Sequence, residues 1–165
     1  MPKGYGFHRD VANGDLEVVV NGTTVKSFTT TGETTTGTIA ATGAITSSSA
    51  TAASGYTTGA GDAVTQQTNK QTGVTISKPC GKITMNNEAL AGAAETTFIV
   101  TNTLVAATDV VAVSISASGA TAGAYTVTAD EVAAGTFNIT LGNHTAGSLS
   151  EAVIVNFVVI KAVAA

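Results

Sequence analysis

Two stretches near the end of the chain decide its fold: Gly135-Thr136-Phe137-Asn138-Ile139-Thr140-Leu141-Gly142 and Ala152-Val153-Ile154-Val155-Asn156-Phe157-Val158-Val159-Ile160-Lys161. In the first stretch large apolar residues alternate with polar ones, which is the period of a strand with one buried face. The second stretch is apolar on both faces except at Asn156. It predicts a strand that lies centrally in a sheet or at a subunit interface.

Similar strand-like stretches recur at short intervals in the preceding part of the chain, with glycines in the connecting turns. They cover residues 74–76, 82–85, 97–103, 109–116 and 124–129. About seven short strands separated by turns predict an all-β fold, a β-sandwich with a jelly-roll-like arrangement. Residues 86–91 predict a single helical turn, because asparagine precedes glutamate, alanine and leucine there.

The composition agrees with strands and turns and indicates a covered surface. Charged residues make up 11% of the 165-residue chain, against roughly 25% in an ordinary soluble domain. Threonine and valine favour strands, whereas the ordinary helix formers are scarce. With so few charges, we expect partner chains or copies of the chain to cover much of its surface.

The first third of the chain has a different character. Leu16–Val20 and Thr23–Phe28 flank Asn21-Gly22, which is the strongest short signal for a β-hairpin. An isolated hairpin is marginally stable in water, so this one must dock on its own body or on another chain. We therefore divide the chain into an N-terminal anchoring segment, residues 1–54, and a β-sandwich body, residues 55–165.

Residues 29–55 contain no leucine, valine or aromatic residue and are rich in threonine, glycine and serine. They predict either a flexible linker or a stalk. For a stalk, Ile39 and Ile45 are six residues apart and share one face of an extended strand. Three copies around a threefold axis would bury that face.

Several classes of function are disfavoured by charge and hydropathy. The net charge is −4 and the seven basic residues are scattered, which argues against a nucleic-acid partner. No apolar run approaches the ~20 residues of a membrane span, so we expect no membrane partner. Residues 1–25 lack the apolar core of a signal peptide, which favours synthesis and assembly in the cytoplasm.

The sequence also offers little catalytic or metal-binding chemistry. His8 and His144 have no partner at the short spacing of a metal site. Cys80 follows proline in a predicted turn, and nothing in the sequence indicates that folding brings His144 beside it as a base, so we interpret it as a small, buried, inert thiol. Thr126 and Thr128 have the Thr-x-Thr pattern of flat binding arrays, but such pairs are irregular along the chain. We therefore expect no enzyme, no catalytic residue, no metal and no cofactor.

The body resembles a recurrent module of tailed-phage virion proteins. The likeness extends over about residues 54–165 and depends on structural motifs. The matching stretches are Ser54–Gly61, Val64–Gln66, Gly81–Asn86, Thr121–Val127, Ala146–Ala152 and Asn156–Lys161. In look-alikes this module ends head decoration (cement) proteins, head fibres or tail fibres, and the segment before it carries the attachment. Here that segment is short and hairpin-like, which favours capsid decoration over a tail fibre.

The resemblance implies a homotrimer on the capsid surface of a virion, bound to the major capsid protein and assembled in the host cytoplasm. The residues expected to anchor it are Tyr5, Phe7, Leu16, Val18, Val20 and Phe28. The residues expected at the trimer interface are Ile39, Ile45, Val158 and Ile160.

Two alternatives stay open at this point. A head-fibre or tail-fibre tip would bind the host surface, for example a glycan, through the turns at residues 117–123 and 142–149. A polysaccharide-binding module or weak enzyme would show a ligand-dependent shift in melting temperature.

Overall fold

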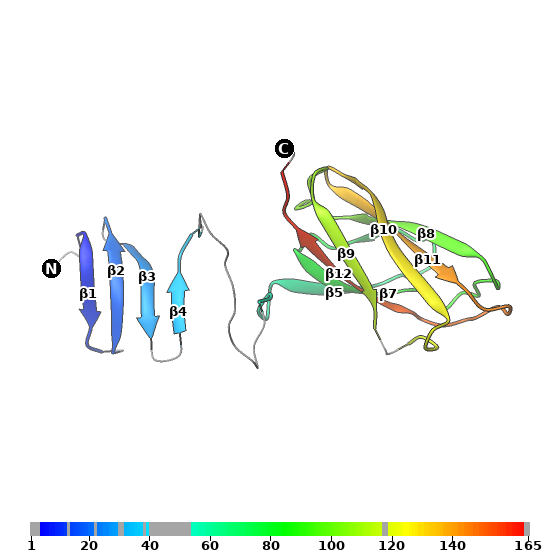
Figure 1. Cartoon of the computed structure of the whole chain (residues 1–165), viewed down its shortest axis with the longest axis horizontal. Helices are drawn as coiled ribbons and strands as arrows, with labels where there is room; N and C mark the ends of the chain where they lie inside the picture. Colours follow the sequence, from blue (N-terminus) through cyan, green and yellow to red (C-terminus); the bar gives the residue numbers. More distant parts are fainter. Residues whose placement is uncertain are drawn as a thin grey trace. The chain divides into compact units, whose positions relative to one another are not determined.

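The computed structural model describes residues 4–12, 14–21, 23–29, 32–37, 39, 54–116 and 119–163. The chain divides into two compact units, Met1–Ser54 and Gly55–Ala165. Every helix or strand assigned in the described residues is a strand (Figure 1). The prediction of an all-β fold is therefore confirmed.

The first unit contains one antiparallel sheet, in which each strand pairs with the next along the chain. Its strands are β1 (Gly6–Asp10), β2 (Asp15–Val20), β3 (Thr23–Thr29) and β4 (Gly32–Thr35). The predicted hairpin is confirmed as β2 and β3, and Asn21 in its turn has the positive φ of 48° that this turn requires. An extra residue in β3 shifts the register between Val18 and Val19.

The hairpin is flanked on both sides, which the sequence did not indicate. Strand β1 pairs with β2, and β4 pairs with β3. Strand β4 falls within the segment interpreted as a linker or stalk. It was not predicted, because its sequence, Gly32-Glu-Thr-Thr, has no apolar residue that would indicate a strand. Its register is supported by an ion pair between Lys26 Nζ and Glu33 Oε1 at 2.8 Å. Ile45, predicted for a threefold stalk, lies outside the described residues.

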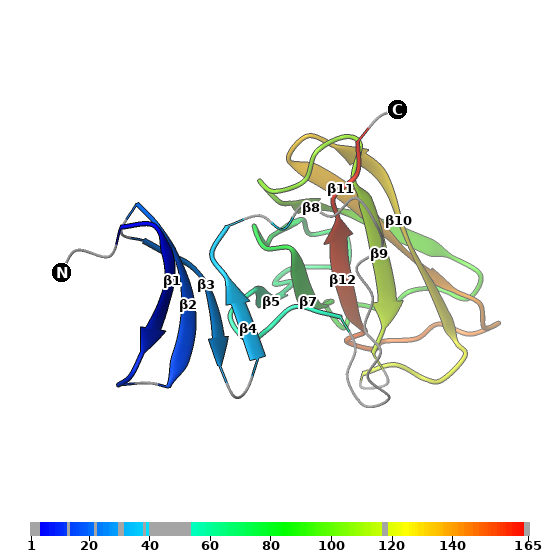
Figure 2. The ribbon, with the colours of Figure 1, turned by 60° about the vertical axis from the view of Figure 1, so that its left-hand side comes forward.

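The second unit is a β-sandwich of two four-stranded sheets, which lie one behind the other in Figure 2. One sheet has the order β5 (Gly61–Thr65), β7 (Cys80–Thr84), β12 (Ile154–Ile160), β9 (Val110–Ile115). The other has the order β10 (Tyr125–Ala133), β11 (Thr136–Asn143), β8 (Glu95–Thr101), β6 (Val74–Thr75). The pairs β5–β7 and β6–β8 are parallel and the others antiparallel. The sandwich is confirmed, and the jelly-roll connectivity stays a prediction.

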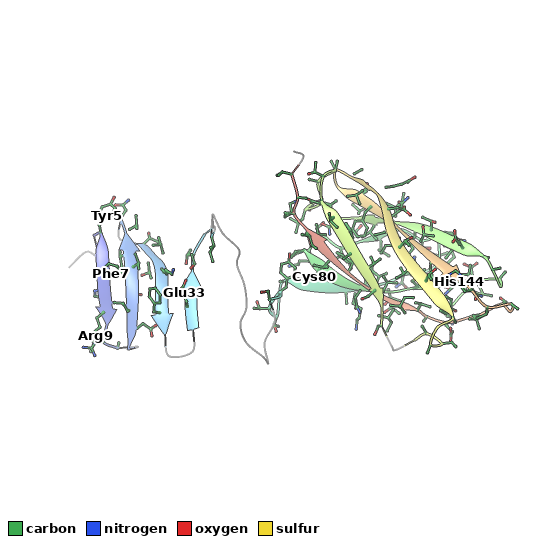
Figure 3. All side chains as sticks on the ribbon, viewed as in Figure 1. Tyr5, Phe7, Arg9, Glu33, Cys80 and His144 are labelled. Carbon is green, nitrogen blue, oxygen red and sulfur yellow. The ribbon has the colours of Figure 1, made fainter. Side chains whose placement is uncertain are left out.

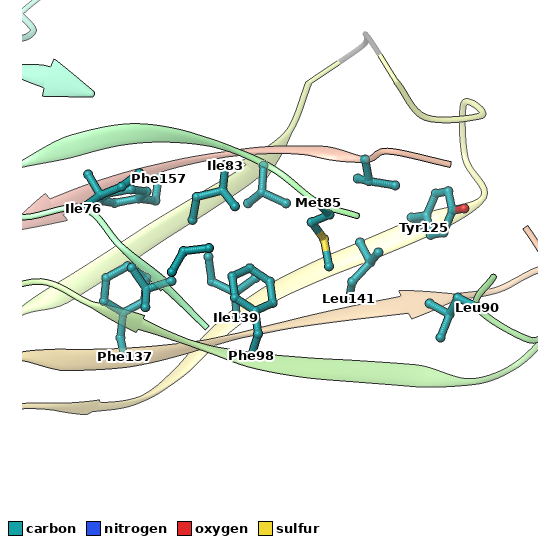
Figure 4. Close-up of a cluster of buried hydrophobic side chains, with 14 of the residues drawn as sticks. Ile76, Ile83, Met85, Leu90, Phe98, Tyr125, Phe137, Ile139, Leu141 and Phe157 are labelled. Atoms are coloured by element: carbon teal, nitrogen blue, oxygen red, sulfur yellow. The ribbon is translucent and has the colours of Figure 1, made fainter. Parts of the chain in front are cut away.

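The alternation in the sequence places the core between the two sheets (Figure 4). Phe137 of β11 and Phe157 of β12 meet there, with ring centroids 5.4 Å apart and a tilt of 57°. Gly81 on β7 makes room for this contact, because a Cβ at that position would come within 2.6 Å of the Phe157 ring. The central position predicted for the last strand is confirmed, since β12 pairs with β7 on one side and β9 on the other.

The predicted helical turn at residues 86–91 is wrong. Leu90 instead forms a bridge with Leu149, with N–O distances of 2.9 and 3.0 Å. The buried Asn143 explains this, because its Nδ2 donates to the carbonyl oxygens of Leu90, Ala91 and Gly147 at 2.9–3.1 Å. Each carbonyl oxygen also accepts from another group, namely the Leu149 N–H, the Ala94 N–H and the Thr145 hydroxyl respectively, so Asn143 of β11 adds a further donor to a turn that is not helical.

A buried lysine holds another set of loops together. Lys70 Nζ donates to the carbonyl oxygens of Asn86 and Glu151, and its backbone N–H donates to Glu88 Oε2 at 3.1 Å. Burial lowers the pKa of Lys70, while the nearby carboxylates of Glu88 and Glu151 oppose that shift. Lys70 therefore ties the β5–β6 loop to the ends of β7 and β12.

Replacing Asn143 with alanine is expected to destabilise the sandwich by about 2–3 kcal/mol, because several buried hydrogen bonds are lost at about 1 kcal/mol each. Asn143 Oδ1 also accepts from the backbone N–H of Thr145 at 2.9 Å. The free energy of unfolding in urea measures the effect. Asn138→Ala in the same strand is the control, since Asn138 makes an exposed contact with Glu131 at 2.6 Å and should change stability by about 0.5 kcal/mol or less. Equal effects of the two variants would contradict this role for Asn143.

Candidate partner-binding surfaces

The sheet of the first unit has one apolar face. Because side chains of paired residues project to the same side of a sheet, the pairs Phe7–Val18 and Leu16–Phe28 share a face. Val20 follows the same alternation along β2. Phe7 is 78% exposed, Leu16 44% and Phe28 38%. This set, hereafter the N-terminal apolar face, comprises Phe7, Leu16, Val18, Val20 and Phe28.

The opposite face of this sheet is mainly polar. Thr24 Oγ1 donates to Glu17 Oε1 at 3.1 Å, and Ser27 Oγ donates to Asp15 Oδ2 at 3.4 Å. Val19 is the apolar exception and is buried. The two faces therefore differ in the way expected of a sheet that is solvated on one side and covered on the other.

Three charged side chains accompany the N-terminal apolar face. Lys26 pairs with Val18 and lies 5.3 Å from the centre of the Phe28 ring, so a cation–π contact adds to its ion pair with Glu33. Arg9 pairs with Leu16 in the register of β1 and β2. Sequence reasoning missed these charges, although Lys26 and Phe28 are two residues apart in a predicted strand.

The structure gathers most of the predicted anchoring residues on this one face. Tyr5 is exposed immediately before β1, and Figure 3 shows Tyr5, Phe7 and Arg9 following one another along the chain. Extension of a partner's sheet by the edges of the hairpin is ruled out within this unit, because β1 and β4 already pair with those edges. The outer edges of the sheet are those of β1 and β4.

A second apolar surface covers the outer side of the β5–β7–β12–β9 sheet. Since Val155, Phe157 and Val159 point into the core, the alternate residues of β12 point outward. The outward residues of the two adjoining strands β12 and β9 are Ile154, Asn156, Val158, Ile160, Val110, Ala112 and Ser114. Val158 and Ile160, predicted for a trimer interface, both lie here. Ile39, predicted for the same interface, is exposed after β4 in the first unit.

The outer side of the other sheet has a contrasting chemistry. Threonines stand in register across its strands in two rows, Thr128–Thr140–Thr97 and Thr136–Thr101–Thr75. The Thr97 and Thr140 hydroxyl groups are 2.8 Å apart and bond to each other. Ile99 is the exposed large apolar residue on this side. Sequence reasoning missed these rows, because the register between strands is set only in the folded chain.

His8 belongs to the first unit, and His144 and Cys80 lie at separate places in the second. His144 Nε2 and Thr126 Oγ1 are 2.7 Å apart at the surface, and Cys80 is the half-buried first residue of β7 rather than part of a turn (Figure 3). Among the described residues, no group of three or more histidine, cysteine, aspartate or glutamate side chains is placed to hold a metal ion. No helix in the described part of the chain is long and apolar enough to cross a membrane.

The end of β12, which carries Ile160, is fastened to the loop before β9. The buried Asp109 accepts from Lys161 Nζ at 2.5 Å and from the Ala106 N–H at 2.8 Å. The hydrogen bond from Ala106 first, and Lys161 second, hold the pKa of Asp109 below its ordinary value of 3.8. This contact keeps Ile160 beside its partner Val110.

The stability contributed by Asp109 is expected to depend on pH. Because its pKa is lower in the folded chain than in the unfolded chain, the contribution is complete above the ordinary value of 3.8 and is lost as the pH falls through the folded pKa. The difference in unfolding free energy between the wild type and Asp109→Asn should therefore be largest near neutral pH and shrink below 3.8. Urea unfolding from pH 7 to pH 3 measures it, and a difference independent of pH would contradict the assignment.

Comparison with protein-family models, with curated proteins and with solved structures found no match to this chain. The argument about function therefore depends on the surfaces described above. Two of the three are apolar and exposed, and each is built by one regular sheet.

Proposed function

We propose that the chain is a structural virion protein of a tailed phage, a capsid decoration (cement) protein that stabilises the head shell. In this proposal the N-terminal sheet binds the major capsid protein and the sandwich forms a homotrimer on the capsid surface. The observation that carries the proposal is the N-terminal apolar face, whose Phe7, Leu16 and Phe28 are exposed on a single regular sheet.

The physical support is that such a face gains free energy when a partner covers it. Burial of apolar surface contributes about 25 cal/mol per Å². Large exposed apolar patches are uncommon on monomeric proteins and mark interaction sites. In a trimer, three anchors would bind as a unit, so that individually weak contacts sum to high avidity through effective concentration. The choice of a capsid partner comes from the resemblance of the sandwich sequence to phage virion modules.

Co-sedimentation with undecorated heads of the phage whose genome encodes the chain tests the proposal. The wild type should saturate the heads at a fixed ratio. The variant Phe7→Ser with Phe28→Ser should bind at least about a hundredfold more weakly, because each ring contributes about 1.5 kcal/mol or more when buried on a partner.

The matched control changes the opposite face of the same sheet, with Thr24→Ala and Ser27→Ala, and should bind as the wild type does. Circular dichroism establishes that both variants keep their strands. A wild-type protein that ignores the heads, or a Phe7/Phe28 variant that still decorates them, would overturn the proposal.

A specific observation favours a second candidate, a head-fibre or tail-fibre tip that binds a host-surface glycan. A hollow of about 250 Å³ is lined by Ile115, Ser116, residues 120–123 and Tyr125. The turn after β11 adjoins it, since the His144 N–H donates to the Ala124 carbonyl at 2.8 Å. Burial first, and the Glu151 carboxylate second, raise the pKa of Tyr125 to about 12, and the Tyr125 hydroxyl oxygen is itself buried, so the exposed residues 121–123 are the ones open to a ligand.

Under this second candidate, Ala122→Trp, which would fill the hollow, is expected to abolish binding on a glycan array while the fold is kept. A melting shift of the wild type on addition of an array-positive glycan would extend the same test to a polysaccharide-binding module. Absence of any glycan signal would remove both alternatives.

A further inference from the structure

The outer side of the β5–β7–β12–β9 sheet carries a protrusion and a hollow side by side. The protrusion consists of Val110 and Ile160, which pair across β9 and β12 and are 54% and 53% exposed. The hollow, of about 230 Å³, lies next along the same two strands between Ala112, Ser114, Asn156 and Val158. It exists because β9 presents the small side chains of Ala112 and Ser114 where β12 presents larger ones.

We infer that copies of this chain bind one another here, with Val110 and Ile160 of one copy inserted into the hollow between β9 and β12 of the next copy. This inference deepens the proposed homotrimer and depends on it for the number of copies. It assigns the contact to named residues, two of which, Val110 and Ala112, the sequence did not single out.

The chemistry of the surface fits a second copy of the same chain. Lys82 is the one charged residue among the outward positions of the four described strands, which are otherwise apolar or small and neutral. Copies with a net charge of −4 repel one another in general, but a face without carboxylates lets them approach. The outer side of the other sheet, with Glu95, Asp130 and rows of threonine, has the composition of a solvated face.

The protrusion and the hollow are different patches, so one copy can offer its protrusion to one neighbour and its hollow to another. Such a heterologous contact generates a ring when the rotation between copies closes. Ser114 and Asn156, which line the hollow, supply polar groups that would fix the orientation of the inserted copy. Asp109 and Lys161, described above, hold the protrusion in place at the ends of β9 and β12.

The mass of the full chain in solution tests the inference, by light scattering or native mass spectrometry. The wild type should have three times the 16.2 kDa of one chain. Val110→Asp with Ile160→Asp should reduce the mass to that of one chain, and Ala112→Phe, which fills the hollow, should do the same. Ile99→Asp is the matched control, because Ile99 is equally exposed at 53% on the other sheet and should leave the trimer intact.

Cys80 supplies a second readout that does not depend on the mass. It is the only cysteine of the chain and pairs with Val158 on the same outer side. Its reaction with a thiol reagent should be slow in the wild type and faster in the aspartate and Ala112→Phe variants, with no change in Ile99→Asp. Circular dichroism with the strand signal of the wild type and a cooperative melting transition would show that the variants remain folded, because loss of the trimer by itself lowers the melting temperature.

The inference is overturned by a wild-type monomer, by aspartate variants that keep the wild-type mass, or by loss of the trimer in Ile99→Asp alone. A monomer whose Cys80 is nonetheless protected would also overturn it, because another part of the same chain would then cover the face. Head binding is scored separately: a trimer that ignores heads overturns the decoration role and leaves this contact standing.

Discussion

The contact between Phe137 and Phe157 is the constraint on which the rest of the sandwich depends. It joins the central strands of the two sheets, and it is available only because position 81 is a glycine. Because the inner faces of both sheets are buried in this core, only the outer faces, the edges and the loops can bind a partner. Several loops are fixed by buried side chains: Asn143 and Lys70 each donate to carbonyl groups of loops that are distant in the sequence. The regular outer faces are therefore the surfaces left for partners.

The outer faces of the two sheets of the sandwich carry different types of residue, and the amino-acid composition alone does not reveal this difference. A chain with 11% charged residues does not spread its charges evenly. The β10–β11–β8–β6 sheet presents mainly threonine, asparagine, aspartate and glutamate beside Ile99, whereas β12 and β9 present mainly valine, isoleucine and alanine beside Asn156 and Ser114, with Lys82 on β7. The threonine hydroxyl group forms hydrogen bonds with water without adding charge, and the branched Cβ of threonine favours the strand conformation. The low charge of the chain is thus compatible with one solvated face and one that gains from being covered.

Much of this arrangement could be predicted, and the failures have a common cause. Alternation at Phe137, Ile139 and Leu141 predicted a buried strand face, and the two-sided apolar pattern of residues 153–160 predicted a central strand. Strand β4 escaped prediction because an edge strand needs only backbone pairing and leaves no apolar signal. The helical turn at residues 86–91 was wrong because Leu90 pairs with Leu149 and Asn143, which lie more than fifty residues away. The neighbours Val110 and Ile160 are likewise brought together by register between strands, which local sequence does not encode.

The N-terminal sheet differs from the sandwich in a way that bears on how it would act. Within the described part of Met1–Ser54, its apolar face has no second layer, so its register depends on backbone pairing, the Lys26–Glu33 ion pair and cross-strand contacts. Exposed ion pairs contribute little, and small sheets without a covered face are marginally stable. A partner that covers Phe7, Leu16 and Phe28 would therefore supply part of the stability of the sheet that binds it. Binding and ordering would then be one event, and the weaker fold of this unit would make its attachment reversible until several copies hold the same shell.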